Sequence, residues 1–485
     1  MGILSAILWL PAAAALLVLL LPARSTNLIR GVALAGSGLA FAMAWNLLGS
    51  FDRSSVVPQF QERASWVPEM GMSYALGVDG VSLPMVLLTT LISLLALLAS
   101  GSINERVKQY FAWFLVLETA MLGVFMAQDW FLFYMYYEIA LVPMFFLIGV
   151  WGGKERAAAS MSFFLYTLAG SVLMLLGLIA AYLATPEHSF DMQTMGRAAA
   201  GWTTGFQIAA FLACLAGFAV KVPVFPLHGW LPLAHVEAPV PVSMVLSAVL
   251  LKMGAYGLLR MADLFPAGFE WFTPVLFVLG LINIVYGALM AWRQNDLKAM
   301  VAFSSISHMG FVLVGLSAMT SAGFSGAMLQ MFTHGLISAA LFMLVGMIYE
   351  RTHTRQITDF GGLYGRVPRY SVLMTLALLA SMGLPGLAGF VAEFHALVGA
   401  FERWGPVAGV ACIGVLITAA YALRTISRMF SGPLNPRLGE LSDLTAREMA
   451  AAVPLVAMIV ALGLFPGAAL QMVGQAAAPL LAGLR

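Results

Sequence analysis

The sequence predicts an all-α polytopic membrane protein. Hydrophobic residues make up 61% of its 485 residues and charged residues only 9%, whereas soluble domains carry about 25% charged residues. Apolar runs of about 20 residues, the length that crosses the hydrocarbon core of a bilayer, recur from one end of the chain to the other. They leave no stretch long enough for a soluble domain of ordinary size.

About fourteen such runs are predicted to be transmembrane helices. They are 3–22, 28–49, 79–100, 110–127, 129–150, 158–184, 205–223, 240–260, 271–291, 299–319, 323–349, 370–400, 405–430 and 449–473. The fourth and fifth runs meet at Gln128 and Asp129, so almost nothing separates them. An even number of crossings predicts that the two termini lie on the same side of the membrane.

Lysine and arginine are distributed unevenly between the connectors, and this bias predicts orientation. Connectors that follow odd-numbered helices hold 16 basic residues, namely Arg24, Arg30, Arg106, Lys108, Lys154, Arg156, Arg293, Lys298, Arg351, Arg355, Arg366, Arg369, Arg424, Arg428, Arg437 and Arg447. The opposite side, termini included, holds six, namely Arg53, Arg63, Arg197, Arg260, Arg403 and Arg485. We therefore expect both termini to face away from the cytoplasm.

Two of the predicted helices, the seventh and the twelfth, are interrupted by glycine and proline. They read AVKVPVFPLHGW and GLPGLAGFVAEF, and each carries one charge at membrane depth, Lys221 and Glu393. Paired discontinuous helices in two inverted repeats are typical of an ion site. We therefore divide the chain into helices one to three (1–109), a first five-helix repeat (110–260), a second, inverted five-helix repeat (261–430), and a C-terminal loop with the fourteenth helix (431–485).

Glu138 lies in the middle of helix five, and Lys221 is its natural partner. A buried carboxyl group on its own favours the neutral form, whereas a nearby ammonium favours the carboxylate. The pair would then act as a switch, because protonation of the carboxylate frees the lysine to lose a proton. The alternative is a static ion pair that holds two helices together.

Lys252, His308, His334 and Glu393 are the remaining strong candidates for proton transfer. Burial disfavours the charged form of a lysine, as a relay near neutral pH requires, although Lys252 would instead be a surface residue if it snorkelled to the interface. Histidine titrates near neutrality; the alternative for each of these two is a hydrogen-bonded core histidine. Glu393 is either the last charge at membrane depth or an acid at a helix end.

Glu118, in helix four, and His228 and His235, in the proline-rich connector after helix seven, are weaker candidates. The chain has no C-x-x-C pair, no G-x-G-x-x-G after a strand and no Walker loop, so we expect no cofactor and no metal in it. A net charge of +2 gives no reason to expect a nucleic-acid partner. Energy for transport must then come from an ion gradient or from partner subunits.

In their order along the chain, these motifs resemble the antiporter-like membrane subunits of respiratory complex I, the NADH:quinone oxidoreductase. The motifs are DWFLFYMYYEIALVPM, AVKVPVFPLHGWLP, LLKMGAYGLLR, SSISHMGF, ERTHTR and GFVAEF, and the resemblance covers nearly the whole chain. Within that family the chain is most similar to the M-type subunits. The L- and N-type subunits and the cation/proton antiporter subunits typically have lysine where this chain has Glu393.

The resemblance implies a proton-translocating subunit of the membrane arm, in a bacterial inner membrane with both termini periplasmic. It assigns the proton route to Glu138, Lys221, Lys252, His308, His334 and Glu393. NADH, FMN, iron–sulfur clusters and quinone would bind to partner subunits, so no redox chemistry is expected in this chain. The expected partners are the other membrane subunits, above all the L- and N-type, and the lipid bilayer.

The chain departs from the family pattern in the connector after helix seven. Leu233 replaces the acid of the motif L-P-D-A-H, and residues 238–243 read APVPVS in place of APTAGS. These changes bear on the conformation of the connector and leave the central charges intact. Two other functions stay open at this point, a subunit of a Na⁺/H⁺ antiporter complex and a membrane subunit of a hydrogenase-type complex.

Overall fold

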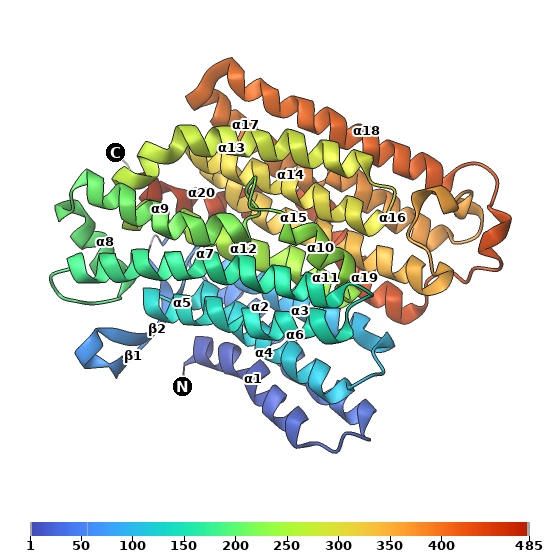
Figure 1. Ribbon diagram of the computed structural model, residues 1–485, viewed down its shortest axis with the longest axis horizontal. Coiled ribbons are helices and arrows are strands. Elements are labelled where there is room, and N and C mark those ends of the chain that lie inside the picture. The colour runs from blue at the N-terminus through green and yellow to red at the C-terminus, as the bar shows by residue number, and fades with distance from the viewer. Residues whose placement is uncertain (1, 56, 483–485) are drawn as a thin grey trace.

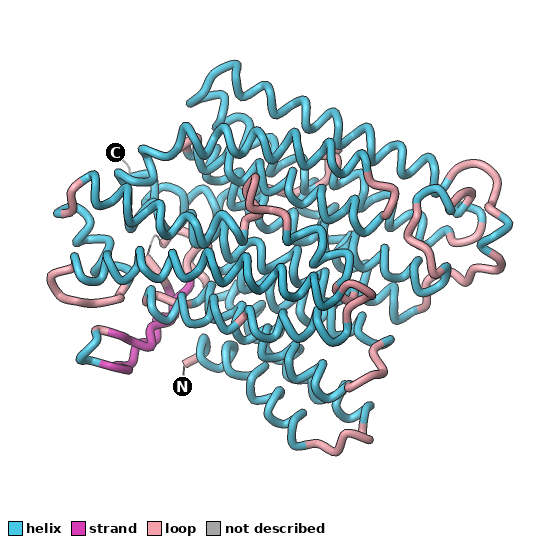
Figure 2. The backbone as a smooth tube through the Cα atoms, in the orientation of Figure 1, coloured by secondary structure: helices cyan, strands magenta, loops and turns pink. Residues whose placement is uncertain are grey.

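The structure, a computed structural model, describes residues 2–55 and 57–482 as a bundle of long helices lying side by side (Figure 1). Apart from one small hairpin, the regular structure in Figure 2 is helical. The first ten helices are α1 Ile3–Leu20, α2 Thr26–Ser50, α3 Ser82–Ala99, α4 Val107–Met126, α5 Trp130–Ile139, α6 Leu141–Trp151, α7 Arg156–Ala184, α8 Met192–Ala198, α9 Thr204–Lys221 and α10 Trp230–Glu237. The others are α11 Val240–Val245, α12 Leu251–Leu264, α13 Pro266–Arg293, α14 Leu297–Ser317, α15 Ser321–Thr352, α16 Pro368–Ser381, α17 Ala388–Trp404, α18 Ala411–Phe430, α19 Ala446–Leu464 and α20 Gly467–Ala482.

The prediction of an all-α polytopic membrane protein is confirmed. Within the described residues, thirteen helical segments are long and apolar enough to cross a membrane. One of them, Ala388–Phe430, has 43 residues, about twice what a bilayer requires. It turns at Gly405, which has a φ of +61°, and Figure 1 shows α18 running back along the bundle from this turn.

Thirteen segments stand where fourteen were expected because α17 and α18 are counted together in Ala388–Phe430 and the first half of the twelfth predicted helix is too short to be counted. That first half, α16, has only 14 residues, and the chain is not helical again until Ala388. Gly383 and Gly386 lie in this break with φ of +77° and +90°, a region that only glycine enters at little cost. The predicted span is therefore two half-helices, α16 and α17.

Helix seven is interrupted as predicted, between α9 and α10. A break at membrane depth is tolerated where protein satisfies the freed backbone groups. Asn283 of α13 does so here, because its Oδ1 accepts the N–H of Phe225 at 2.8 Å and its Nδ2 donates to the carbonyl of Pro223 at 3.1 Å. The indole N–H of Trp230 donates to the carbonyl of Val220 at 2.9 Å.

The connector between the second and third spans contains a β-hairpin that the hydropathy pattern did not predict. Strand β1, Gln59–Val67, pairs antiparallel with β2, Met72–Val78. Glu62 in β1 accepts hydrogen bonds from the backbone N–H groups of Leu4 at 2.7 Å and Ser5 at 3.2 Å. The hairpin thus supplies an N-terminal cap for α1, whose first amides have no partner within the helix.

The last predicted span, 449–473, is wrong as one continuous helix. Helix α19 ends at Leu464, and α20 starts at Gly467 after Pro466. Proline lacks an N–H group and restricts the residue before it, and Phe465 accordingly has the non-helical angles φ −128° and ψ 60°. Helix α20 packs against α15 and the end of α12 and not as a continuation of α19.

The two ends of the bundle differ in what they carry. The N- and C-terminal ends, the β-hairpin and α8 lie at the same end of the bundle in Figure 1, here called the termini end. The long connectors after α15 and α18, rich in arginine, lie at the opposite end. Arg485, counted above on the side of the termini, lies outside the described residues. Which end faces the cytoplasm remains a prediction.

Candidate functional site

Lys221 is the last residue of α9, directly at the first break. Its side chain is buried, and its ammonium Nζ donates to the carbonyl of Tyr137 at 3.1 Å. The same Nζ lies 3.3 Å from the centre of the Tyr137 ring, a cation–π contact. A Cβ on Gly254 would lie 2.9 Å from the Cβ of Lys221, so glycine in the motif LLKMGAYG lets α12 pass this close.

Glu138 is half-buried at the end of α5. The structure places it near Lys221 without a direct ion pair, because the described residues contain no carboxylate within 4.0 Å of that ammonium. Its Oε1 has no hydrogen-bond partner among the described residues, and Ser171 of α7 lies beside the carboxyl group. The static ion pair weighed above is therefore not what the structure contains.

Lys252 lies in the centre of the bundle with its side chain fully buried. Its Nζ lies 2.6 Å from Nδ1 of His334 on α15 and donates to the carbonyl of Ser247 at 2.6 Å. Ser247 belongs to a π-helical turn, Leu246–Leu250, directly before α12. Such turns are frequent at functional sites, and here one of their carbonyls holds the lysine.

His308 and Glu393 continue the row of polar groups towards the second break. The rings of His334 and His308 have centroids 5.4 Å apart, and Nδ1 of His308 lies 2.8 Å from Oε1 of Glu393. Nε2 of His308 lies 3.0 Å from the hydroxyl of Ser381, the last residue of α16. The four predicted residues from Lys252 to Glu393 thus form one contiguous row, while Lys221 lies next to it across α12.

Of the weaker candidates, only His235 lies near this row. It is fully buried, stacks on Phe342 with centroids 4.6 Å apart, and neither ring nitrogen has a partner among the described residues. Its imidazole lies within electrostatic reach of Lys252 and Lys298. His228 instead bonds Tyr286 at 3.1 Å, and Glu118 bonds Ser37 at 3.0 Å, both away from the row.

Lys298 was counted above among the basic residues of a connector, but the structure buries its side chain. Its side chain is 3% exposed, and its Nζ hydrogen-bonds to the carbonyls of Ala238 and Val236. A cavity of about 220 Å³ reaches it from the end opposite the termini and also contacts Glu237 and Arg355. No local sequence pattern predicts this burial, because an acid followed by a lysine, as at Asp296 and Lys298, is common at the start of exposed helices.

Two other polar residues were missed. Gln330 on α15 donates to Oε1 of Glu393 at 3.3 Å, and Asn283 holds the first break as described above. Asn283 is the only strongly polar side chain in the run 271–291, and that signal could have pointed to it. Gln330 carries a similar signal, since it and His334 are the strongly polar side chains of the run 323–349.

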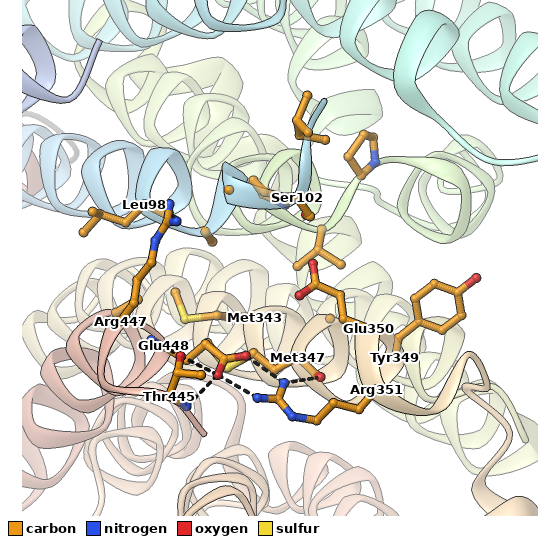
Figure 3. A pocket seen from close by; sticks show the side chains of 18 residues that line it. Leu98, Ser102, Met343, Met347, Tyr349, Glu350, Arg351, Thr445, Arg447 and Glu448 are labelled. Carbon is orange, nitrogen blue, oxygen red and sulfur yellow. Dashed lines mark hydrogen bonds and ion pairs between the residues drawn. The ribbon is translucent and has the colours of Figure 1, made fainter. Parts of the chain in front are cut away.

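Arg351 and Arg355, two of the basic connector residues counted above, each pair with a carboxylate. Arg351 forms two hydrogen bonds of 2.7 Å with Glu448, and Arg355 lies 3.0 Å from Asp296. Figure 3 shows Arg351 and Glu448 beside a cavity of about 690 Å³, into which Glu350 also points. Helices α3, α15 and α19 meet at this cavity, so the pair ties the long C-terminal connector to the bundle.

Comparison with known proteins identifies the family. The family model described as NADH:quinone oxidoreductase/Mrp antiporter, TM matches residues 127–418, and that of the amino terminus of NADH-ubiquinone oxidoreductase chain 4 matches 59–127. NADH-quinone oxidoreductase subunit M of Rhodobacter capsulatus is 44% identical over 496 aligned positions, covering 99% of this chain and 96% of its own length. This chain belongs to the subunit M family of NADH-quinone oxidoreductase.

A further relative and two solved structures are similar to this chain. NAD(P)H-quinone oxidoreductase chain 4 1 of Synechococcus sp. strain JA-3-3Ab is 43% identical, covering 96% of this chain and 90% of its own length. A chain of respiratory complex I from Thermus thermophilus with bound NADH superposes with a TM-score of 0.91 at 30% identity over 100% of both chains. A chain of the Mrp complex from Dietzia sp. DQ12-45-1b superposes with a TM-score of 0.87 at 23% identity, over 100% of both chains, which shows a shared fold.

Proposed function

We propose that this chain is the proton-translocating subunit M of a respiratory NADH:quinone oxidoreductase and moves protons along the row from Lys252 to Glu393. The single observation that carries the proposal is the contact of Lys252 with His334, at 2.6 Å. A lysine and a histidine that lie this close together and are both buried can exchange one proton. Histidine accepts and releases protons near neutral pH. His308 and Glu393 extend the same chain of donors and acceptors.

Lys221 and Glu138 act as the regulated end of this route. The ammonium of Lys221 is held by one ring face and one carbonyl, and the carboxyl group of Glu138 beside it has an unpaired oxygen. Lys221 can therefore gain or lose its charge when Glu138 changes its own. The ammonium of Lys221 lies beside α12, so its charge acts on Lys252 through a low-dielectric interior. Quinone reduction in partner subunits supplies the energy, and NADH, FMN, iron–sulfur clusters and quinone bind there.

The remaining expectations belong to the same proposal. The two interrupted helices support the two inverted five-helix repeats, 110–260 and 261–430, with an ion site at their interface. The arginine-rich connectors support an inner-membrane protein with periplasmic termini. Membrane subunits of the L- and N-type are the expected neighbours. The cavity that reaches Lys298 is then the cytoplasmic access, with His235 between Lys298 and Lys252.

The test compares Lys252→Met with Lys154→Met in native membrane vesicles that carry the assembled complex. Both substitutions replace a lysine by a side chain of similar length without the ammonium, but Lys154 is exposed in the turn before α7. We expect proton uptake per quinone reduced to fall at least twofold in Lys252→Met and to be unchanged in Lys154→Met. Unchanged uptake in an assembled Lys252→Met complex would contradict the proposal.

A sodium-coupled antiporter subunit is the alternative that the same assay separates. Replacing external Na⁺ by choline leaves proton uptake unchanged if protons are the transported ion. A requirement for Na⁺ that disappears in Lys252→Met would assign the row to cation exchange instead.

A further inference from the structure

A cavity of about 710 Å³ at the termini end lies outside the row described so far. It is enclosed by the β2–α3 connection, the start of α5, helix α8, the end of α12 and helix α20. Its charged lining residues are Asp79, Arg197, Arg260 and Asp263. With two acidic and two basic side chains, the cavity has no net charge and favours water over an ion of either sign.

Asp79 and Arg260 form an ion pair in the wall of this cavity. The atoms Oδ2 and Nη2 are 2.6 Å apart, and the two side chains are 13% and 12% exposed. Oδ1 of Asp79 accepts the N–H groups of Val81 and Ser82 at the start of α3, which fixes the carboxylate. Burial acts to raise the pKa of Asp79, but Arg260 and these hydrogen bonds outweigh it and hold the pKa below its usual value.

Arg260 also connects this pair to the interior. Lys252, Tyr256 and Arg260 follow one another at intervals of four residues on α12, so they share one face of the helix. The guanidinium carbon of Arg260 lies 4.9 Å from the centre of the Tyr256 ring. Eight residues of helix span about 12 Å, which is the length of the stretch between Arg260 and Lys252.

Tyr256 occupies the middle of that stretch. Its side chain is fully buried, and its hydroxyl has no hydrogen-bond partner among the described residues; the same holds for Nε of Arg260. Buried polar atoms in proteins are almost always bonded to protein or to water. Nε of Arg260 and the hydroxyl of Tyr256 lie one after the other between the cavity and Lys252, and each is a position where a water molecule can bind.

We propose that the cavity is an aqueous vestibule and that the Asp79–Arg260 pair gates a water-filled branch that passes Tyr256 and reaches Lys252. The branch takes water and protons, and it gives Lys252 a connection to the termini end that does not run through Glu393. With the pair closed, the guanidinium separates the vestibule from Tyr256. Proton transfer through the branch rests on the proposed function of Lys252, whereas the vestibule and its gate do not.

The test measures water access at position 256 by cysteine labelling. Tyr256→Cys is made in a Cys412→Ser background, because Cys412 is exposed and Cys214 is buried. The assembled complex in native vesicles is treated with a charged, membrane-impermeant methanethiosulfonate from each side, and the chain is then isolated. Asp79→Asn, which keeps the shape of the side chain and removes its charge, is added in a second strain.

We expect slow labelling of Tyr256→Cys from the termini side and at least a tenfold faster rate when Asp79→Asn opens the pair. Tyr370→Cys is the matched control, since Tyr370 is also a buried tyrosine with an unpartnered hydroxyl but lies on α16. Its rate should not respond to Asp79→Asn. Equal rates for Tyr256→Cys with and without Asp79→Asn would overturn the gate.

Tyr256→Phe provides a second readout that does not depend on a cysteine. It removes the hydroxyl and keeps the ring that packs on Phe125 and Phe133. We expect a loss of proton uptake per quinone reduced of at least a quarter, with no loss in Tyr370→Phe. If Lys252→Met lowers uptake at least twofold but Tyr256→Phe leaves it unchanged, the proposed function stands and the branch is overturned. If labelling responds to Asp79→Asn while Lys252→Met pumps normally, the vestibule stands and the proposed function is overturned.

Discussion

The ammonium nitrogen of Lys252 lies 2.6 Å from Nδ1 of His334, and both side chains are buried. An ammonium has only donors and a neutral imidazole has one acceptor nitrogen. A charged lysine therefore requires that Nδ1 of His334 be unprotonated, which places the ring hydrogen on Nε2. When the proton passes to Nδ1, the lysine becomes neutral, and the two residues exchange one charge between them.

His334→Gln removes the titration at this position and keeps a hydrogen-bonding side chain. We expect proton uptake per quinone reduced to fall at least twofold, because glutamine can bond Lys252 but cannot carry its proton. His353→Gln is the control, since His353 is exposed in the connector after α15. The measurement is dye-reported proton uptake in native vesicles, and normal uptake in His334→Gln would remove this histidine from the route.

Glu393 is tested by two substitutions that differ in chemistry. Glu393→Gln keeps the shape but cannot ionise, so we expect a severe loss of quinone-coupled proton uptake. Glu393→Lys restores a titratable group at the same place, and we expect it to retain part of the activity. Each proton moved against 100 mV costs about 2.3 kcal/mol, so a site that cannot change its charge cannot hold and release it.

Glu402→Gln controls for the first of these changes, because Glu402 is exposed at the end of α17. Wild-type rates for both Glu393 variants would show that the proton route does not pass through this residue.

Lys221→Ala and Glu138→Ala are each expected to lose most proton pumping and quinone reductase activity while the complex still assembles. The two groups lie next to each other without a direct ion pair, so removing one does not leave its partner buried and newly unpaired. Lys154→Ala and Glu155→Ala change exposed residues at the start of α7 in the same way. Assembly is followed on native gels, and normal pumping by either assembled variant would exclude the pair from the mechanism.

Asn283→Leu tests the structural support of the first break. It leaves the N–H of Phe225 and the carbonyl of Pro223 without a partner, and an unsatisfied buried polar group costs about 1–3 kcal/mol. We expect the solubilised complex to lose this chain at a lower temperature than the wild type does. Asn46→Leu, at an exposed asparagine of α2, should leave that temperature unchanged, and an equal shift in both variants would speak against the role of Asn283.

The orientation is tested by a cysteine at Ser54, which is exposed in the connector before β1. We expect it to react with an impermeant maleimide in cells whose outer membrane alone has been made permeable. A cysteine at Ser431, exposed at the opposite end of the bundle after α18, should react only after the inner membrane is opened. The reverse pattern would overturn the orientation derived from the basic residues.

The sequence predicted the helices well and singled out the central charges, because both signals are local. Lys252 and Glu393 are single charges in apolar runs, and a charge at membrane depth is costly enough to be informative. The burial of Lys298 was not predicted, because hydropathy cannot tell whether the start of a helix is covered by another segment. The row from Lys252 to Glu393 could not be predicted, because it joins residues of α12, α14, α15 and α17 that meet only in the folded bundle.

The hairpin cap of α1 bears on the order in which the chain can be built. Glu62 follows Leu4 by 58 positions, and chains emerge from the ribosome N-terminal end first. Helix α1 therefore leaves the ribosome before its cap exists, and its first amides depend on water until strand β1 has crossed to the same side. In the predicted orientation, with the termini end periplasmic, the earliest helix to be synthesised is completed only after the later hairpin has been translocated. Its final placement would then depend on the insertion of α2.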